Sequence, residues 1–192
     1  MTPRYQIIFV SLLLIVNLGC SDKNLKKIEG QIDAQGAGEI RLGKAYSEVL
    51  SKIDETVYEV SPNDKNGFQI KKDRKIIISF WSKNQDSTIG FVKVLSDSYQ
   101  TEKGLKVGDS IDKVRTIYPE LKLVFDEMDS EYYFAPEDLQ VYDKDKPEIL
   151  CLFYVDTKEK NIDFEMNEKT NRFESSMDIQ GIIKHVLIYK WK

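Results

Sequence analysis

The sequence predicts an α+β fold of two tandem modules, in each of which a short helix precedes a 3–4-stranded antiparallel sheet. The first observation is a repeat: residues 42–49 (LGKAYSEV) and 107–114 (VGDSIDKV) both place an aliphatic residue before Gly and a Val six positions after it. The second is that strand-like apolar runs follow both copies in the same order. The third is a composition of 41% hydrophobic and 31% charged residues, which is typical of globular proteins.

Residues 1–19 have the features of a lipoprotein signal peptide. The apolar run 7–16 has the length of an export-signal h-region and is too short to span a bilayer. Gly19 and Cys20 follow closely and resemble a bacterial lipobox, although Asn17 stands where the usual pattern has Leu. The resemblance implies cleavage before Cys20 and acylation of this cysteine. The alternatives are an ordinary secretory signal with an incidental cysteine and an uncleaved anchor.

Acylation of Cys20 would place the folded part of the chain on a membrane of the bacterial cell envelope, because two or more acyl chains anchor a protein stably. Ser21 follows the cysteine and favours the outer membrane over the inner one, since Asp is the usual retention signal there. Residues 20–38 are polar and glycine-containing, so we expect a flexible tether. The GAG at 36–38 completes no G-x-G-x-x-G motif and is not a dinucleotide loop.

The first module is predicted over residues 39–106. Its helix start is weak because Lys44 and Ala45 cannot cap a helix with a side-chain oxygen. An apolar stripe at Val49 and Ile53 nevertheless favours a helix. The expected strands of this module are 56–61, 68–72, 75–82 and 88–98.

The second module is predicted over residues 107–192. Asp109 or Ser110 can cap its helix, and Pro119 ends it. A polar insertion near 156–180 has no counterpart in the first module, and chance similarity is the alternative to a true duplication. The expected strands are 121–127, 132–134, 139–143, 148–155 and 182–191, of which 148–155 corresponds to 75–82 as a buried central strand.

The segment 99–114 (YQTEKGLKVGDSIDKV) resembles the glycine-containing helix start of small lipoproteins of the outer-membrane β-barrel assembly type (SmpA/OmlA-like). It also resembles the tandem modules of β-lactamase-inhibitory proteins. Both groups have helices on one face of an antiparallel sheet, and both are binding proteins. The resemblance therefore implies a binding function and carries over no catalytic residue. This chain departs from the pattern in having one clear helix in each copy where those families usually have two.

Charge argues against nucleic acid as a partner. The chain has 28 basic and 32 acidic residues, a net charge of −4, so no basic excess attracts phosphates. Residues 21–106 contain 15 basic and 13 acidic residues, whereas 107–192 contain 12 basic and 19 acidic ones. The second half is thus the acidic one and can steer a basic partner, although a solvated face is the simpler interpretation.

No motif for catalysis, a metal or a cofactor is evident. The chain has one histidine, His185, which excludes a multi-His metal site and is expected to be packed in a strand. An enzyme built on His185 and a distant acidic partner is the minority hypothesis. Cys151 lies in an apolar run and is expected in the core. The acidic turns at 126–131 and 143–145 lack the spacing of a calcium loop.

Tyrosine and tryptophan are the side chains that we expect to contact a partner, because both are favoured in interfaces. The candidates for such a surface are Trp81, Tyr99, Tyr132, Tyr133 and Trp191, together with Tyr189, although most are expected in the core. We therefore expect a non-enzymatic envelope lipoprotein that binds another protein. The alternative is a hydrolase inhibitor or small-ligand-binding lipoprotein, which a concave aromatic face across both modules would favour.

Overall fold

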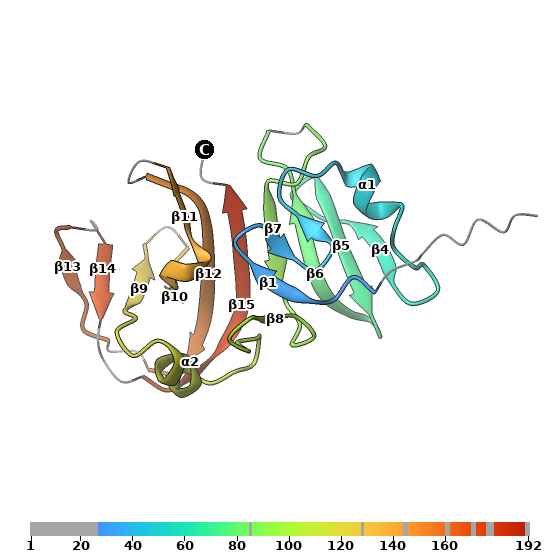
Figure 1. The fold of residues 1–192 in the computed structure, drawn as a ribbon. Coiled ribbons are helices and arrows are strands. Elements are labelled where there is room, and N and C mark those ends of the chain that lie inside the picture. The colour runs from blue at the N-terminus through green and yellow to red at the C-terminus, as the bar shows by residue number, and fades with distance from the viewer. Residues whose placement is uncertain are drawn as a thin grey trace, which may run out of the picture.

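A computed structural model describes residues 27–84, 86–127, 129–143, 146–159, 162–169, 172–175 and 179–190. The expected signal peptide, the expected acylation site Cys20 and the candidate Trp191 lie outside these ranges. The described residues form two β-sheets with two short α-helices, α1 and α2 (Figure 1).

The larger sheet has 11 strands and is antiparallel throughout. Its order is β13-β14-β9-β10-β12-β15-β7-β6-β5-β4, with β11 beside β12. Its strands are β4 (Glu59–Pro62), β5 (Gly67–Lys72), β6 (Lys75–Trp81), β7 (Phe91–Val94), β9 (Leu123–Asp126), β10 (Glu131–Phe134), β11 (Val141–Asp143), β12 (Lys146–Thr157), β13 (Glu165–Asn167), β14 (Arg172–Ser175) and β15 (Gly181–Lys190). A 3-10 turn, η1 (Glu137–Leu139), connects β10 to β11.

This architecture corrects the fold class expected from the sequence. The prediction of a helix-plus-sheet α+β fold in two modules is wrong, because the described chain is mostly β and its α-helices have only 5 and 7 residues. The strands of both expected modules belong to one sheet, since β7 pairs with β15. Two separate small sheets would each leave an unpaired edge, and this pairing satisfies the backbone groups of both edges.

The two halves of the large sheet contain their elements in the same order. In the first half α1 (Tyr46–Leu50) precedes β4, β5, β6 and β7, and in the second half α2 (Ile111–Ile117) precedes β9, β10, β12 and β15. Because β7 and β15 are neighbours, each half runs outward from the centre in the reverse of its chain order. The expected polar insertion near 156–180 contains β13 and β14, which extend the second half beyond β9.

Both helices begin at the same kind of junction. The backbone N–H of Gly43 donates to the carbonyl of Ile89 (2.7 Å), and that of Gly108 donates to the carbonyl of Ile183 (2.9 Å). Both glycines have positive φ, +80° and +89°, in the region that favours glycine. Ser110 caps α2 by accepting from the N–H of Lys113, whereas α1 has no side-chain cap, as predicted.

The smaller sheet has four strands and contains residues expected in the tether. Its strands are β1 (Gln31–Asp33), β2 (Gly36–Ala37), β3 (Ile40–Arg41) and β8 (Gln100–Thr101). The expectation of a flexible tether over 20–38 is wrong for 28–38, because Ile28, Ile32 and Ala37 are fully buried. Apolar side chains spaced four or five residues apart are enough to bury this otherwise polar segment in the core.

A buried carboxylate fixes the start of this segment to the large sheet. The Glu29 side chain is 1% exposed and accepts hydrogen bonds from Lys72 Nζ (2.7 Å) and the hydroxyl of Tyr58. Burial would raise the pKa of Glu29, but these two hydrogen bonds outweigh it and the pKa lies below its usual value. The segment from residue 28 onward is therefore part of the folded structure.

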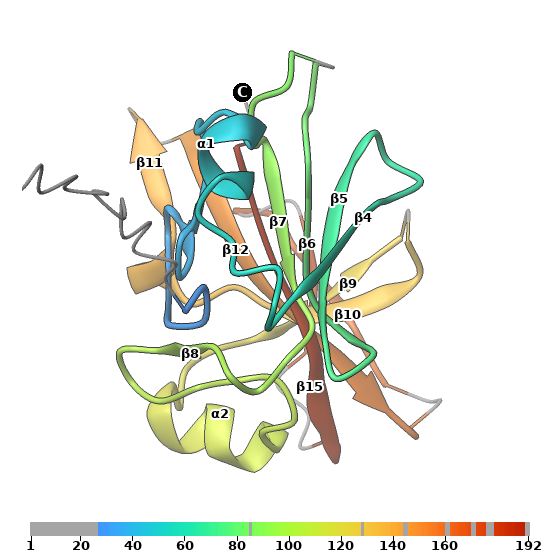
Figure 2. The ribbon, with the colours of Figure 1, turned by 90° about the vertical axis from the view of Figure 1, so that its right-hand side faces the viewer.

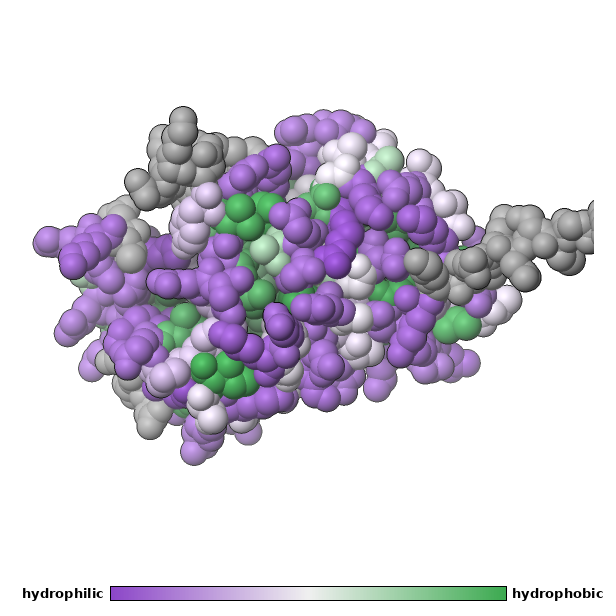
Figure 3. All heavy atoms as spheres, in the orientation of Figure 1, coloured by the Kyte–Doolittle hydropathy of each residue, from purple (hydrophilic) through white to green (hydrophobic). Residues whose placement is uncertain are grey.

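The large sheet has two different faces. In Figure 2, α1, α2 and the smaller sheet all lie to the left of the long strands β7 and β15. Residues of β12 alternate between the faces: Cys151 and Phe153 belong to the main core under these elements, and Leu150 and Leu152 belong to a second cluster on the opposite face. The outer surface of the helix-covered side is mostly hydrophilic (Figure 3).

The two equivalent junctions generate a stability prediction. Gly43→Ala and Gly108→Ala should each cost about 1–2 kcal/mol of unfolding free energy, because an L side chain at positive φ is strained while open space surrounds both positions. Urea denaturation of the two variants measures this cost. Gly30→Ala is the control and should be nearly neutral, since its new Cβ meets only an ordinary contact at 3.4 Å. An unchanged unfolding free energy in Gly43→Ala or Gly108→Ala would contradict the predicted backbone strain at that position.

Candidate binding groove

A cavity of about 830 Å³ lies on the face of the large sheet opposite the helices. We call it the groove. Its size falls in the range of small-molecule sites. Three leucines, Leu150, Leu152 and Leu187, give it an apolar floor on β12 and β15. The other residues that line it are Lys83, Phe91, Val124, Phe125, Asp126, Glu127, Asp129, Tyr133, Tyr154, Met166, Arg172, Phe173, Tyr189 and Lys190.

One row of aromatic rings crosses the junction between the two halves. Trp81 on β6 pairs with Phe91 on β7, which pairs with Tyr189 on β15. The rings are stacked, with centroids 5.1 Å and 5.5 Å apart and interplanar angles of 7° and 16°. Lys65 places its ammonium 4.6 Å from the centroid of the Trp81 ring. The row is a consequence of strand register, because directly opposed side chains on one face lie close together.

A second aromatic row lies on β10, β12 and β15. Tyr133 pairs with Tyr154, and Tyr154 pairs with His185. The Tyr133 and Tyr154 centroids are 5.6 Å apart, and His185 stacks on Tyr154 at 4.6 Å. All three side chains are less than a tenth exposed although they lie on the face opposite the helices. Tyr133 and Tyr154 line the groove, and His185 packs against Tyr154 beside it.

The tyrosine hydroxyls of the groove lie close to the end of β9. The Tyr154 hydroxyl donates to Asp126 Oδ2 over 3.5 Å. Burial, and then nearby charges that include Asp126, raise the pKa of Tyr133 and Tyr154 and raise the pKa of Tyr189 to about 12. Tyr154 is the one of the three phenols that contacts Asp126, and the charge of Asp126 also reaches the other two. Convergent polar groups above an apolar floor are characteristic of ligand sites.

His185 is held neutral in this environment. The imidazole is 3% exposed, and burial followed by the positive charges of Lys93, Lys184 and Lys65 lowers its pKa to about 3. Among the described residues no carboxylate or hydroxyl forms a hydrogen bond with it. The structure therefore places His185 as a buried residue that stacks on the groove residue Tyr154. Among the described residues it has no acidic hydrogen-bond partner of the kind that the minority hypothesis of an enzyme requires.

The structure separates the aromatic residues that were expected to form one contact surface. Tyr133 lines the groove, whereas Trp81 stacks on the groove residue Phe91 without lining the groove itself. Tyr99 is fully buried, so its expected role as a contact residue is wrong. Tyr132 lies on the core side of the sheet, where its ring stacks on Phe164 at 5.5 Å. Tyr189, which the sequence also suggested, lines the groove, and Trp191 lies outside the described residues.

Several groove residues were not singled out from the sequence. Phe91, Tyr154 and Leu187 read as ordinary core positions because they stand in expected strands that are rich in apolar residues. The signal that could have found them is the run 148–155, in which both alternating sets of side chains are apolar. Cys151 is fully buried in the main core, as expected, and burial raises the pKa of its thiol, which makes it unreactive.

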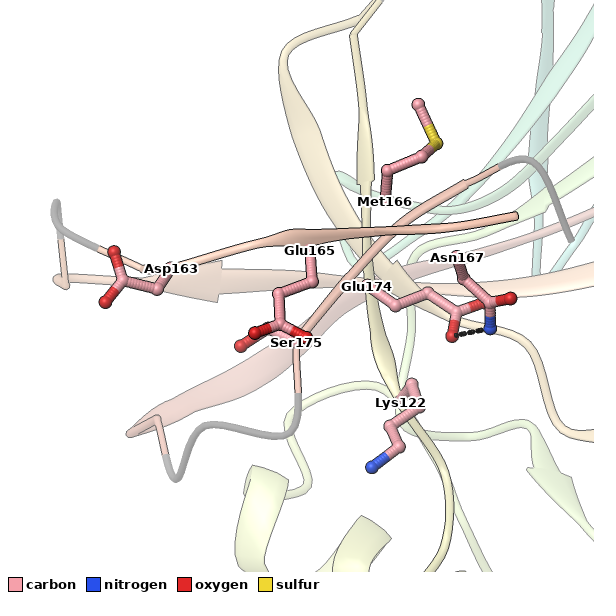
Figure 4. A pocket seen from close by; sticks show the side chains of 7 residues that line it. All are labelled: Lys122, Asp163, Glu165, Met166, Asn167, Glu174 and Ser175. Atoms are coloured by element: carbon pink, nitrogen blue, oxygen red, sulfur yellow. Dashed lines mark hydrogen bonds between the residues drawn. The ribbon is translucent and has the colours of Figure 1, made fainter. Parts of the chain in front are cut away.

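A second hollow of about 510 Å³ lies beside the β13–β14 hairpin (Figure 4). Glu165 and Glu174 face each other across this hairpin, and Asn167 Nδ2 donates to Glu174 Oε2 over 2.7 Å. The acidic character is partly offset by Lys122 below it.

No cluster of His, Cys, Asp or Glu among the described residues could hold a metal ion. No helix in the described part of the chain has the length and apolarity to cross a membrane.

Neither protein families nor curated protein sequences match this chain. In structure it is similar to the uncharacterized protein yfeY from Escherichia coli, with 11% sequence identity and a TM-score of 0.49 over 83% of this chain and 99% of that chain. The resemblance to SmpA/OmlA-like lipoproteins and β-lactamase-inhibitory proteins stays a prediction. Conclusions about function depend on the geometry of the groove.

The lowered pKa of His185 predicts an acid-sensitive fold. The unfolded chain binds a proton near the usual pKa of 6.5 and the folded chain binds it only near 3, so stability falls as the pH drops below about 6.5. Between pH 7 and pH 5 the loss should be about 2 kcal/mol. His185→Phe keeps the stack on Tyr154 and should remove this loss, since the chain has no other histidine. Urea denaturation at pH 7 and at pH 5 measures the unfolding free energy of both proteins. An equal loss of unfolding free energy between the two pH values in the wild type and in His185→Phe would refute the prediction.

Proposed function

We propose that this chain is a membrane-anchored lipoprotein of the bacterial cell envelope that binds a small ligand in the groove and does not catalyse a reaction. The observation that carries the binding part is that Phe91 and Tyr189, which stack across the junction of the two halves, both line the groove. The anchoring part rests on the lipobox-like Gly19 and Cys20. We expect the outer rather than the inner membrane because Ser21 follows the cysteine.

The groove favours a small ligand over the protein partner that the sequence suggested first. A protein interface usually presents aromatic anchors on an exposed patch. Here Tyr133 and Tyr154 are 8% and 3% exposed and lie inside a hollow, where a flat protein surface cannot reach them. An envelope protein partner that inserts a narrow segment into the groove is the second candidate.

The side chains of the groove support binding rather than proton transfer. His185 is neutral and stacked, and the tyrosine hydroxyls hold their protons because burial raises their pKa. A general acid or base works best with a pKa near the operating pH, and the groups with shifted pKa values here are moved away from it. The minority hypothesis of an enzyme built on His185 gains no support from this arrangement.

Groove binding predicts a selective loss on substitution. Leu187→Asp places a carboxylate on the apolar floor and should weaken binding of the uncharged fluorescent dye N-phenyl-1-naphthylamine at least tenfold. Ile182→Asp is the matched control, because Ile182 lies on the same strand but is 47% exposed and outside the groove. Fluorescence titration of the three proteins measures the affinities. Equal dye affinity in all three would refute binding in the groove.

Anchoring at Cys20 has its own test. Cys20→Ala should leave the chain unacylated, so that the intact mass of the purified protein lacks the acyl groups and the protein leaves the membrane fraction. Mass spectrometry and fractionation of cells that express either form measure both effects. Acylation of Cys20 would be contradicted if the wild-type protein had only the mass of its polypeptide. It would also be contradicted if both proteins exceeded their polypeptide masses by the same amount.

A further inference from the structure

The groove has charged residues of opposite sign at two different sides. Lys83, which lies between β6 and β7, and Lys190, at the end of β15, line it on one side. Asp126, Glu127 and Asp129 line it from the β9–β10 turn. Strands β10 and β12 lie between that turn and β15.

Arg172 on β14, the strand beside β9, also lines the acidic side, and Lys190 Nζ lies 3.6 Å from Glu148 Oε1 outside the groove. Three carboxylates against one guanidinium leave that side acidic, and the two lysines leave the other side basic. We call these two sides the acidic edge and the basic edge.

The two lysines of the basic edge are brought together at Gly90. The backbone N–H of Lys190 donates to the carbonyl of Gly90 (3.2 Å). The backbone of Lys83 also lies against Gly90, where a Cβ would come within 2.8 Å of the Lys83 nitrogen. A residue without a side chain at this position allows both lysines to stand at the same end of the floor.

The negative field of the acidic edge reaches the floor. Asp126 accepts from the backbone N–H of Asp129 (3.4 Å), which ties the two carboxylates to one turn. After burial, the charges of Asp126 and Asp129 both contribute to the raised pKa of Tyr154 and of Tyr189, whereas the charge of Arg172 acts in the opposite direction on Tyr189. A positive group bound over these rings would be attracted by the same two carboxylates.

We propose that the ligand of the groove is a short peptide with free termini and apolar side chains. Its ammonium group would lie at Asp126 and Asp129, its carboxylate at Lys83 and Lys190, and its side chains on the leucines and tyrosines between them. A ligand with one sign of charge is repelled at one edge, and an uncharged ligand gains nothing from either. This inference rests on the proposed function, because it names the chemistry of the ligand in the same groove.

The register of the sheet sets the length of such a peptide. Val155 of β12 pairs with Tyr132 near the acidic turn, and Ile149 pairs with Lys190 at the basic edge. These positions on β12 are six residues apart, roughly 20 Å at ~3.3 Å per residue. An extended peptide of about four to six residues covers that distance.

The test uses isothermal titration of the full chain with the pentapeptide ALALA in four forms: free, N-acetylated, C-amidated and blocked at both ends. The free form should bind best, and each block should weaken binding about fivefold, the effect of losing one partly exposed ion pair. Asp129→Asn should weaken the free peptide by the same factor and leave the acetylated one unchanged. Lys190→Gln should likewise weaken the free peptide about fivefold and leave the C-amidated peptide unchanged. Glu55→Gln, an exposed change between α1 and β4 and outside the groove, should alter nothing.

The outcomes separate this inference from the proposed function. If the doubly blocked peptide binds as tightly as the free one, or if the substitutions affect blocked and free termini alike, recognition of a dipolar peptide is wrong. If no form binds while the dye still binds and responds to Leu187→Asp, the peptide inference fails and the groove remains a ligand site. If the dye also ignores Leu187→Asp, both fail.

Discussion

The pairing of β12 with β15 is the contact on which the rest of the structure depends. It runs from Ile149 opposite Lys190 to Thr157 opposite Gly181. Strand β15 also pairs with β7, so the same strand joins the two halves into one sheet. Gly181 makes the end of this pairing possible, because a Cβ there would come within 2.4 Å of the Asp156 carbonyl oxygen. Without β15 between them, β12 of the second half and β7 of the first half would each be an unpaired edge strand.

A sheet with apolar side chains on both faces needs cover on both. On one face the helices, the smaller sheet and the segment beginning at Ile28 provide it, and Phe80, Phe134 and Phe153 are fully buried there. On the other face the described elements form no second layer, and the side chains cover one another in stacked rows. A ligand gains the most binding free energy where it buries apolar surface in a hollow. The architecture of the sheet therefore places the candidate site on this face.

The sequence allowed local features to be predicted better than their assembly. Strand β12 follows from a continuous apolar run, and the Ser110 cap follows from the hydrogen-bonding capacity of one hydroxyl. The joining of β7 to β15 could not be predicted, because nothing in two similar apolar strands says whether they pair with each other. The burial of 28–38 depends on partners far along the chain, such as Lys72 for Glu29. The groove arises from cross-strand register, which links Trp81, Phe91 and Tyr189 across 108 positions of sequence.

Methyl NMR of the protein tests most directly that the groove is the binding site. The side chains Leu150, Leu152 and Leu187 line the groove, whereas Leu105 and Leu123 are buried in the main core. Titration with the free pentapeptide ALALA should shift the methyl signals of the first three and leave those of the other two in place. Shifts confined to Leu105 and Leu123, or no shift at a concentration where heat is released, would contradict a ligand site on this face.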